Sequence, residues 1–308
     1  MIIHSYNGGG IRGLMIAFTM RTAEVVFGKA VTPNIYAGTS VGSIIATLRA
    51  LGYEWLDICK FFSEYGPQIF KRSCLPRILR AKYSDKNINA ILKKYIGEDT
   101  MLSDVKGCVL LIPTVDVSMD MLKVWTNVGN YEVDIEGNHA YSTARGEDAK
   151  LWEVVRASCS APRYFNRSKI NGRMFEDGGL KANNPSLLAY SIARIVTDEP
   201  ICVLSVTTGR KAHKMKESEY NDGVQVASHV IDSTLDAIDK NTHFALQSQM
   251  RPIDTYFRIE MQLAFSSGEV DDVSPKNMRN MMKDSDLSFE KNYSRLSAFS
   301  SNPSKLII

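Results

Sequence analysis

The segment Gly38-Thr39-Ser40-Val41-Gly42 is a GxSxG pattern that stands between a short apolar run and an amphipathic helical pattern. Glycines two positions before and after the serine permit a turn from strand to helix that larger side chains would block. Such a turn exposes the hydroxyl of Ser40 at the start of a helix, where main-chain amides favour negative charge. The pattern predicts Ser40 as the nucleophile of a hydrolase; a small-residue turn without chemistry is the alternative.

A second glycine-rich segment, Gly8-Gly9-Gly10-Ile11-Arg12-Gly13, directly follows the N-terminal apolar run. It has the form GxGxxG, but a dinucleotide site also needs an acid at the end of the next strand, and Glu24 falls inside a predicted helix. No P-loop lysine is present either. We interpret the amides of Gly8, Gly9 and Gly10 as an oxyanion hole, in which fixed N–H donors stabilise a tetrahedral acyl intermediate. A merely flexible turn is the alternative.

A serine nucleophile needs a base, and Asp177 in Glu176-Asp177-Gly178-Gly179 is the preferred candidate. It ends a short predicted strand and precedes two glycines, so it lies in a turn. Histidine is the more usual base, which keeps a Ser-His-Asp triad as an alternative. None of the five histidines stands in a conspicuous motif: His4, His139, His213, His229 and His243.

Together the three motifs resemble those of the patatin-like phospholipase family, over about residues 1–280. The resemblance implies Ser40 as nucleophile, Asp177 as proton acceptor without a histidine, and an oxyanion hole at the first three glycines. Other positions that match the motifs are Arg12, whose role stays open, and Gly13, Gly38, Gly42, Gly178 and Gly179.

Two flanking segments, Ala157–Pro162 and Asn183–Pro185, also match the family, and one position departs from it. The family often has aspartate directly before the three glycines, where this chain has Asn7. An amide keeps some hydrogen bonds but not the charge, so we expect a tuned loop rather than a lost activity.

The resemblance implies a carboxylic ester hydrolase of the phospholipase A type, which cleaves acyl esters of glycerophospholipids through an acyl-enzyme on Ser40 and needs no metal or cofactor. Two alternatives stay open: a water-soluble carboxylesterase, and a membrane-degrading effector of the kind that cyclic nucleotides activate in antiphage defence. The expected partner is a phospholipid or another acyl lipid. The C-terminal third could also serve a homodimer interface or bind a small-molecule or protein activator.

The elements that position these motifs alternate in the manner of a parallel α/β sheet. Strands are expected at residues 2–6, 34–38, 109–117, 123–126, 173–176, 201–206 and 255–261. Helices are expected at residues 14–27, 44–51, 54–66, 85–97 with Asp85 as N-cap, 152–158, 224–250 and 277–283. We therefore predict a three-layer α/β/α patatin-like fold with a mostly parallel central sheet. Residues 1–284 form the domain, and residues 285–308 a loosely packed tail of unknown role.

Composition and net charge indicate a globular protein that does not bind a nucleic-acid polymer. The 308 residues are 44% hydrophobic and 23% charged, which is ordinary for a globular chain, and a net charge of +3 is too weak to indicate a nucleic-acid polymer as partner. Residues 71–82 carry five cations and no acid, a pattern that can bind an anionic membrane surface. Pro76 weakens that pattern, and a solvated loop is the plainer interpretation.

Targeting signals and cysteines point to the inside of a cell. No signal peptide is recognisable at the N-terminus, and no apolar stretch approaches the roughly 20 residues of a spanning helix. The five cysteines contain no CxxC and indicate neither a disulfide framework nor a zinc site, which fits a reducing compartment. We expect a cytoplasmic protein that is at most peripheral at a membrane.

Overall fold

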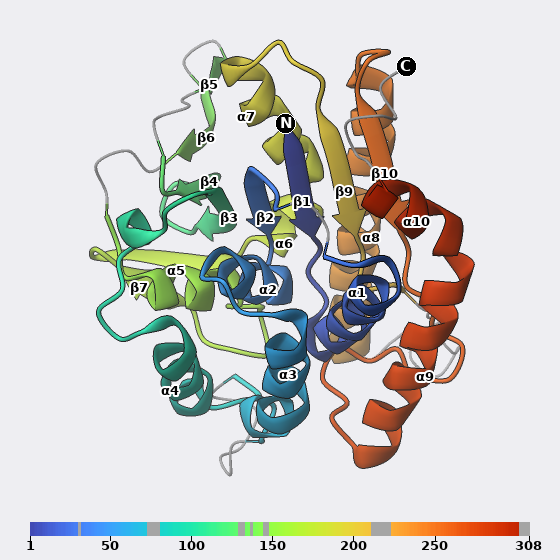
Figure 1. Cartoon of the computed structure of the whole chain (residues 1–308). Coiled ribbons are helices and arrows are strands. Elements are labelled where there is room, and N and C mark those ends of the chain that lie inside the picture. The colour runs from blue at the N-terminus through green and yellow to red at the C-terminus, as the bar shows by residue number, and fades with distance from the viewer. Residues whose placement is uncertain are drawn as a thin grey trace.

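A computed structural model of the chain describes residues 1–29, 32–72, 81–128, 133–135, 138–143, 148–210 and 223–301. A single twisted sheet runs through the centre, with helices on both of its faces (Figure 1). The predicted three-layer α/β architecture with a mostly parallel sheet is confirmed.

The parallel part of the sheet has the order β10–β9–β1–β2–β3. Its strands are β1 (Ile2–Tyr6), β2 (Ile35–Gly38), β3 (Val109–Asp116), β9 (Cys202–Val206) and β10 (Thr255–Ile259). Beyond β3 the sheet continues through β4 (Met121–Thr126), β6 (Asn138–Thr143) and β5 (Val133–Ile135). Strand β4 is antiparallel to β3, β6 is parallel to β4, and β5 is antiparallel to β6. A short hairpin of β7 (Ser168–Ile170) and β8 (Arg173–Asp177) completes the sheet.

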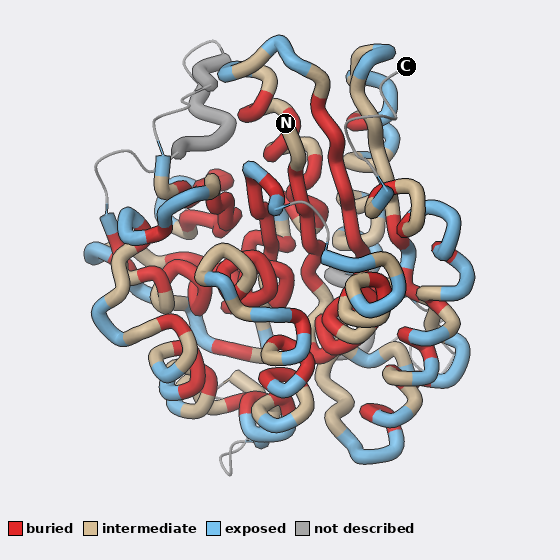
Figure 2. The backbone as a smooth tube through the Cα atoms, viewed as in Figure 1, coloured by how far each residue is buried: buried red, intermediate tan, exposed pale blue. Residues whose placement is uncertain are grey.

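Successive residues of the central strands point to opposite faces, and both faces are covered. On β1, Tyr6 belongs to the core shared with α1, α2 and α3, whereas Ile3 belongs to the core shared with α7 and α8. Figure 2 shows these strands as an almost continuously buried layer, the pattern expected of a parallel sheet with helices on both faces. The helices are α1 (Gly13–Phe27), α2 (Val41–Ala50), α3 (Trp55–Ile69), α4 (Asp85–Ile96), α5 (Leu151–Ser158), α6 (Gly179–Ala182), α7 (Ser186–Val196), α8 (Gly223–Gln249), α9 (Pro275–Lys291) and α10 (Tyr293–Ser301), with 3-10 turns at Gly10–Arg12 and Leu102–Asp104.

Two strands of opposite direction end against the same edge of β3. The parallel strand β2 pairs with β3 as far as Leu111, and the antiparallel strand β8 pairs with β3 from Asp116 back to Thr114. The other edge of β3 is occupied by β4 over this whole length, so β2 and β8 share one edge and their C-terminal ends face each other across a short gap. Ser40 follows the end of β2, and Asp177 is the last residue of β8. This topology brings together two residues that are far apart in the sequence.

The expectation of a loose tail from residue 285 is wrong for the part that the structure describes. Helix α9 runs through that position to Lys291 and packs along α1, and α10 follows it. Leu296 and Phe299 are each only 1% exposed and belong to the main core. Phe289, Tyr293, Leu296 and Phe299 do stand at helical spacing, but most residues between them are polar, so the composition indicated a tail more strongly than the spacing indicated a helix.

The structure also bears on the start of α4 and on the basic run at residues 71–82. The N-cap of α4 is Ser84, whose hydroxyl accepts from the Lys86 amide, whereas Asp85 is the first helical residue. Most of the basic run, residues 73–80, lies outside the described residues. Within the described ranges no helix combines the length and hydropathy needed to cross a bilayer.

Because Phe299 is buried, Phe299→Ala should lower the free energy of unfolding by about 3–5 kcal/mol, the usual cost of such a cavity. Urea denaturation measures this value, with the exposed neighbour Ser294→Ala as control. Equal, small effects of the two substitutions would contradict the packed position of α10.

Candidate active site

Ser40 occupies a strained turn between β2 and α2. Its φ of 53° and ψ of −126° lie outside the usual regions for a side chain, and such strain persists only where the surroundings enforce it. The two flanking glycines are required for space. A Cβ at Gly38 would overlap the carbonyl oxygen of Gly42, and a Cβ at Gly42 would overlap that of Tyr6. The GxSxG segment therefore forms the tight strand-to-helix turn that the sequence predicts.

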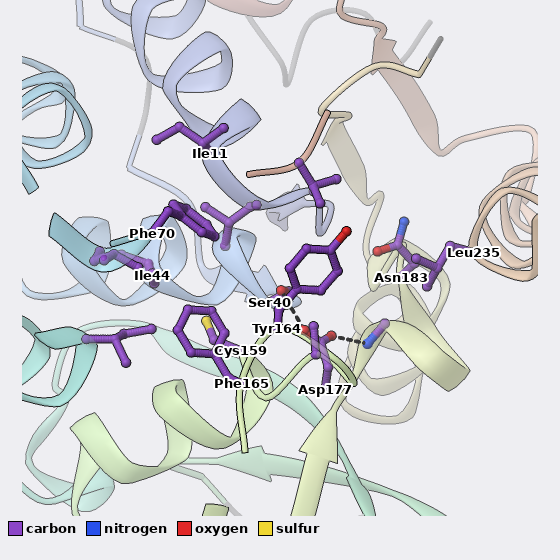
Figure 3. Close-up of a pocket in the computed structure, with 18 of the residues that line it drawn as sticks. Ile11, Ser40, Ile44, Phe70, Cys159, Tyr164, Phe165, Asp177, Asn183 and Leu235 are labelled. Carbon is purple, nitrogen blue, oxygen red and sulfur yellow. Dashed lines mark hydrogen bonds between the residues drawn. The ribbon is translucent and has the colours of Figure 1, made fainter. Parts of the chain in front are cut away.

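The hydroxyl of Ser40 donates a hydrogen bond of 2.7 Å to Oδ2 of Asp177 (Figure 3). The other carboxylate oxygen, Oδ1, accepts from the Gly179 amide at 2.7 Å, which fixes the orientation of the carboxylate. A Cβ at Gly178 would overlap the Pro113 carbonyl, so the chain can turn here only with a glycine. The structure thus brings the two residues predicted as nucleophile and base into direct contact.

Asp177 is only 5% exposed, and burial raises its pKa to about 6, because a charged carboxylate loses its hydration. The hydrogen bonds from Ser40 and Gly179 and the positive charge of Arg156 act in the opposite direction, and Glu176 adds a small upward contribution. The carboxylate is therefore more basic than an ordinary aspartate and still ionised at pH 7.

The segment Gly8–Gly10, here called the glycine loop, is anchored by hydrogen bonds to its main-chain carbonyl groups. The Thr208 hydroxyl donates to the carbonyl of Gly8 at 2.7 Å, and Nε of Arg12 donates to the carbonyl of Gly9 at 3.2 Å. In a trans peptide the carbonyl and the next N–H point in opposite directions, and none of the described peptide bonds is cis. The N–H groups of Gly9 and Gly10 are therefore turned away from these anchors.

The three glycines predicted for the oxyanion hole differ in their surroundings. Gly9 and Gly10 line a cavity beside Ser40, and their amides have no acceptor among the described residues. The Gly8 amide instead donates to the carbonyl of Asn183 at 3.2 Å, which ties the loop to the segment after Asp177. Two of the three amides are thus open to a ligand in this arrangement.

Asn7, the departure from the family pattern, has a partner that explains it. Its side-chain amide donates to Oδ1 of Asp239 at 2.8 Å, and Asp239 also forms an ion pair with Arg258. A carboxylate in place of Asn7 would face Asp239 and repel it, so an amide suits this position.

Sequence reasoning missed the individual roles of Ser158 and Thr208. The Ser158 hydroxyl accepts from the Ser40 amide at 3.0 Å and donates to the Pro113 carbonyl at 2.7 Å, which joins the turn to β3 across the gap. Ser158 lies in the Ala157–Pro162 segment that matched the family, so the segment was found but not its contact. Nothing around Thr208 in the sequence indicated that it would anchor the glycine loop.

A cavity of about 120 Å³ opens beside Ser40 and Asp177. Its wall is mostly aliphatic and aromatic, and Figure 3 shows Ile11, Ile44, Phe70 and Phe165 around it. Further apolar lining comes from Phe62, Ile69, Ile88, Leu235 and Val270. Such a wall suits a hydrocarbon chain, with the polar reacting groups at one side.

The histidines with described side chains have partners away from this site. His4 is buried and hydrogen-bonded to the Tyr6 hydroxyl, and His243 contacts the Tyr256 hydroxyl. The side chains of His139, His213 and His229 lie outside the described residues. Among the described side chains, Asp177 is the base that contacts Ser40.

Comparison with known proteins identifies relatives of the chain. The model of the patatin-like phospholipase family matches residues 5–190, more than half of the chain. Mouse calcium-independent phospholipase A2-gamma is 29% identical over 273 residues, which are 83% of this chain and 34% of that protein. Patatin-like protein 2 of rice is 26% identical over 355 aligned positions, covering 95% of this chain and 84% of that protein.

A third relative is a bacterial phospholipase. The cGAMP-activated phospholipase of Pseudomonas aeruginosa is 30% identical over 187 residues, which are 59% of this chain and 53% of that protein. The chain thus spans about a third of the length of the mouse relative and about half of the bacterial one.

The raised pKa of Asp177 makes a prediction about stability. Because the folded state binds this proton more tightly than the unfolded chain, the proton contributes stability below pH 4 that is lost as the pH rises through about 6. Asp177→Asn has no charge to bury. Its free energy of unfolding, relative to the native protein, should therefore rise by about 3 kcal/mol between pH 4 and pH 8.

Urea denaturation at the two pH values measures this change, and Asp254→Asn is the matched control. Hydrogen bonds from the Ile201 amide, Tyr190 and Arg251 outweigh burial and lower the pKa of Asp254. The stability that Asp254 contributes is lost mainly below pH 4, so the control should change little in relative stability between pH 4 and pH 8. The same trend in both variants would contradict the electrostatic account of Asp177.

Proposed function

Since the chain belongs to the patatin-like phospholipase family, we propose that it hydrolyses acyl esters of lipids, with Ser40 as nucleophile and Asp177 as base. The observation that carries the proposal is the 2.7 Å hydrogen bond from the Ser40 hydroxyl to a buried carboxylate, at the wall of an apolar cavity. A lipid substrate fits the family and the cavity alike.

In the first half-reaction, Asp177 accepts the Ser40 proton while Oγ attacks the ester carbonyl carbon. The tetrahedral intermediate collapses, its bond to the leaving alcohol breaks, and Asp177 returns the proton to that alcohol. In the second half-reaction, Asp177 takes a proton from water as the water attacks the acyl-enzyme. The fatty acid leaves, and the proton returns to Ser40.

The negative charge on the carbonyl oxygen needs fixed donors. We assign this role to the amides of Gly9 and Gly10, which Thr208 and Arg12 orient through the preceding carbonyls. Gly8 completes the loop by its contact with Asn183 and by lying against Ser40. Removal of one such donor typically lowers kcat by about 10²- to 10³-fold.

The apolar wall favours long acyl chains over short soluble esters, and glycerophospholipids are the proposed substrates. Such lipids reside in bilayers, so the protein would meet its substrate as a peripheral protein at a membrane surface, from the cytoplasm. A water-soluble carboxylesterase is the competing function. Hydrolysis that rises sharply once the substrate forms liposomes or micelles supports the phospholipase, and activity confined to monomeric short esters supports the esterase.

Regulation by a small molecule is a second candidate property, favoured by relatives in Pseudomonas aeruginosa and Vibrio cholerae that are named cGAMP-activated phospholipases. Under this hypothesis the purified protein is nearly inactive on liposomes until a cyclic nucleotide is added. Full activity of the protein alone would rule it out.

The direct test compares liposomes treated with the native protein, Ser40→Ala and Asp177→Asn, with fatty acid release measured by mass spectrometry and candidate cyclic nucleotides present or absent. Each substitution removes a reacting group, so we expect losses of about 10⁴-fold or more in kcat. Ser297→Ala and Asp198→Asn, remote from the site, should keep native activity. A Ser40→Ala protein with native activity would contradict the assignment.

A further inference from the structure

Arg156 is a buried cation whose positive charge acts on Asp177, the base of the proposed catalytic pair. It lies in α5, is 3% exposed, and uses all three nitrogens of its guanidinium. Nε donates to Oδ1 of Asn89 at 3.1 Å, and Nη1 donates to the hydroxyl of Ser160 at 2.7 Å. Nη2 donates to the carbonyl of Asn166 at 3.1 Å and forms an ion pair with Asp85.

These contacts hold one wall of the cavity. The guanidinium carbon lies 5.1 Å from the centre of the Phe165 ring, and Phe165 lines the cavity. Together with the bonds to Ser160 and Asn166, this contact fixes residues 160–166 at three points. A rigid wall keeps a bound chain in one place relative to Ser40.

The same network reaches the base. The carbonyl of Ser160 accepts the main-chain N–H of Asp177 at 3.2 Å, so the residue that Arg156 holds by its side chain holds Asp177 by its backbone. The carboxylate is then directed by Ser40 and Gly179. Arg156 is thus linked through Ser160 to the main chain of Asp177, the residue that carries the reacting carboxylate.

Charge gives Arg156 a second effect on Asp177. The ionisable neighbours of the carboxylate are Arg156, Glu176 and the thiol of Cys159. Burial raises the pKa of Cys159 to about 12, so this thiol is neutral, and Glu176 opposes ionisation of Asp177. Arg156 is the positive charge among them that lowers the pKa of Asp177 against the effect of burial.

We propose that Arg156 is a positioning residue of the hydrolase site: it fixes the cavity wall and the backbone of Asp177 through Ser160, and its positive charge favours the carboxylate form of Asp177 over the neutral acid. This inference rests on the proposed function of Asp177 as base. A buried arginine is costly to desolvate, and packing alone would be served as well by an apolar side chain. An electrostatic effect on the buried base accounts for an arginine at this position.

The test measures kcat/KM against pH in liposome hydrolysis. Arg156→Gln removes the charge, so the acidic limb of the profile should move to higher pH, by up to about one pH unit, and activity at pH 6 should fall more than at pH 8. Arg156→Lys keeps the charge but not the planar fork, so it should lower kcat and leave the limb in place. Arg194→Gln, in which another arginine loses an ion pair with an aspartate, should keep the native profile.

The partner of Arg156 supplies a test of opposite sign. Asp85 offsets part of the positive charge, so Asp85→Asn should move the limb to lower pH, whereas a purely structural role would make both substitutions act in the same direction. If Arg156→Gln does not fold, Asp85→Asn and Arg156→Lys still decide the matter. Shifts of equal sign, or no shift in any folded variant, would overturn the proposal.

A titration without substrate separates this inference from the proposed function. In protein labelled with ¹³C at aspartate carboxyl groups, the Asp177 signal is the one missing from Asp177→Asn. Its midpoint should rise in Arg156→Gln and fall in Asp85→Asn. An inactive native protein would overturn the proposed function while these shifts upheld the effect of Arg156, and an unmoved Asp177 signal in an active enzyme would overturn the inference alone.

Discussion

The hydrogen bond between Ser40 and Asp177 depends on two strands of opposite direction that end at one edge of β3. Neither strand could be extended without closing the gap in which the two side chains meet. The space there is so small that glycine is required at Gly38, Gly42 and Gly178, and Ser158 fills what remains by bonding both sides. The local chemistry is thus a consequence of sheet topology.

Burial and hydrogen bonding act against each other at this contact, and their balance gives the site its character. An exposed aspartate would be too weak a base, and a buried one without donors would be protonated at neutral pH. With Gly179, Ser40 and Arg156 acting against desolvation, the pKa of Asp177 settles near 6, close to the pH at which a general base is most effective. The strained backbone of Ser40 and the buried charge reduce stability, as is common at sites shaped for catalysis.

Most of the fold and the turns that carry Ser40 and Asp177 could be predicted from the sequence, because steric and periodic constraints leave a local pattern there. The glycines around Ser40 and Asp177 are examples, and so is the alternation of apolar runs that indicated a parallel sheet. The pairing of Ser40 with Asp177 without a histidine was implied by the resemblance to the family. Thr208 could not be predicted, since it contacts Gly8, which is far away in the sequence. Arg156 could not be predicted either, since its link to Asp177 through Ser160 exists only in the folded chain. Helix α10 was not predicted because the segment is mostly polar. Its position in the fold depends on two buried side chains, Leu296 and Phe299.

The proposed mechanism forms a covalent acyl intermediate on one atom, Ser40 Oγ. The most direct test of the mechanism is to detect that intermediate. Protein mixed with a phospholipid or a slowly hydrolysed acyl ester is quenched in acid, digested and analysed by tandem mass spectrometry. The account predicts the mass of one acyl group on the peptide that contains Ser40, and no such adduct in Ser40→Ala. Hydrolysis without an adduct at Ser40, or with the acyl group on another residue, would contradict it.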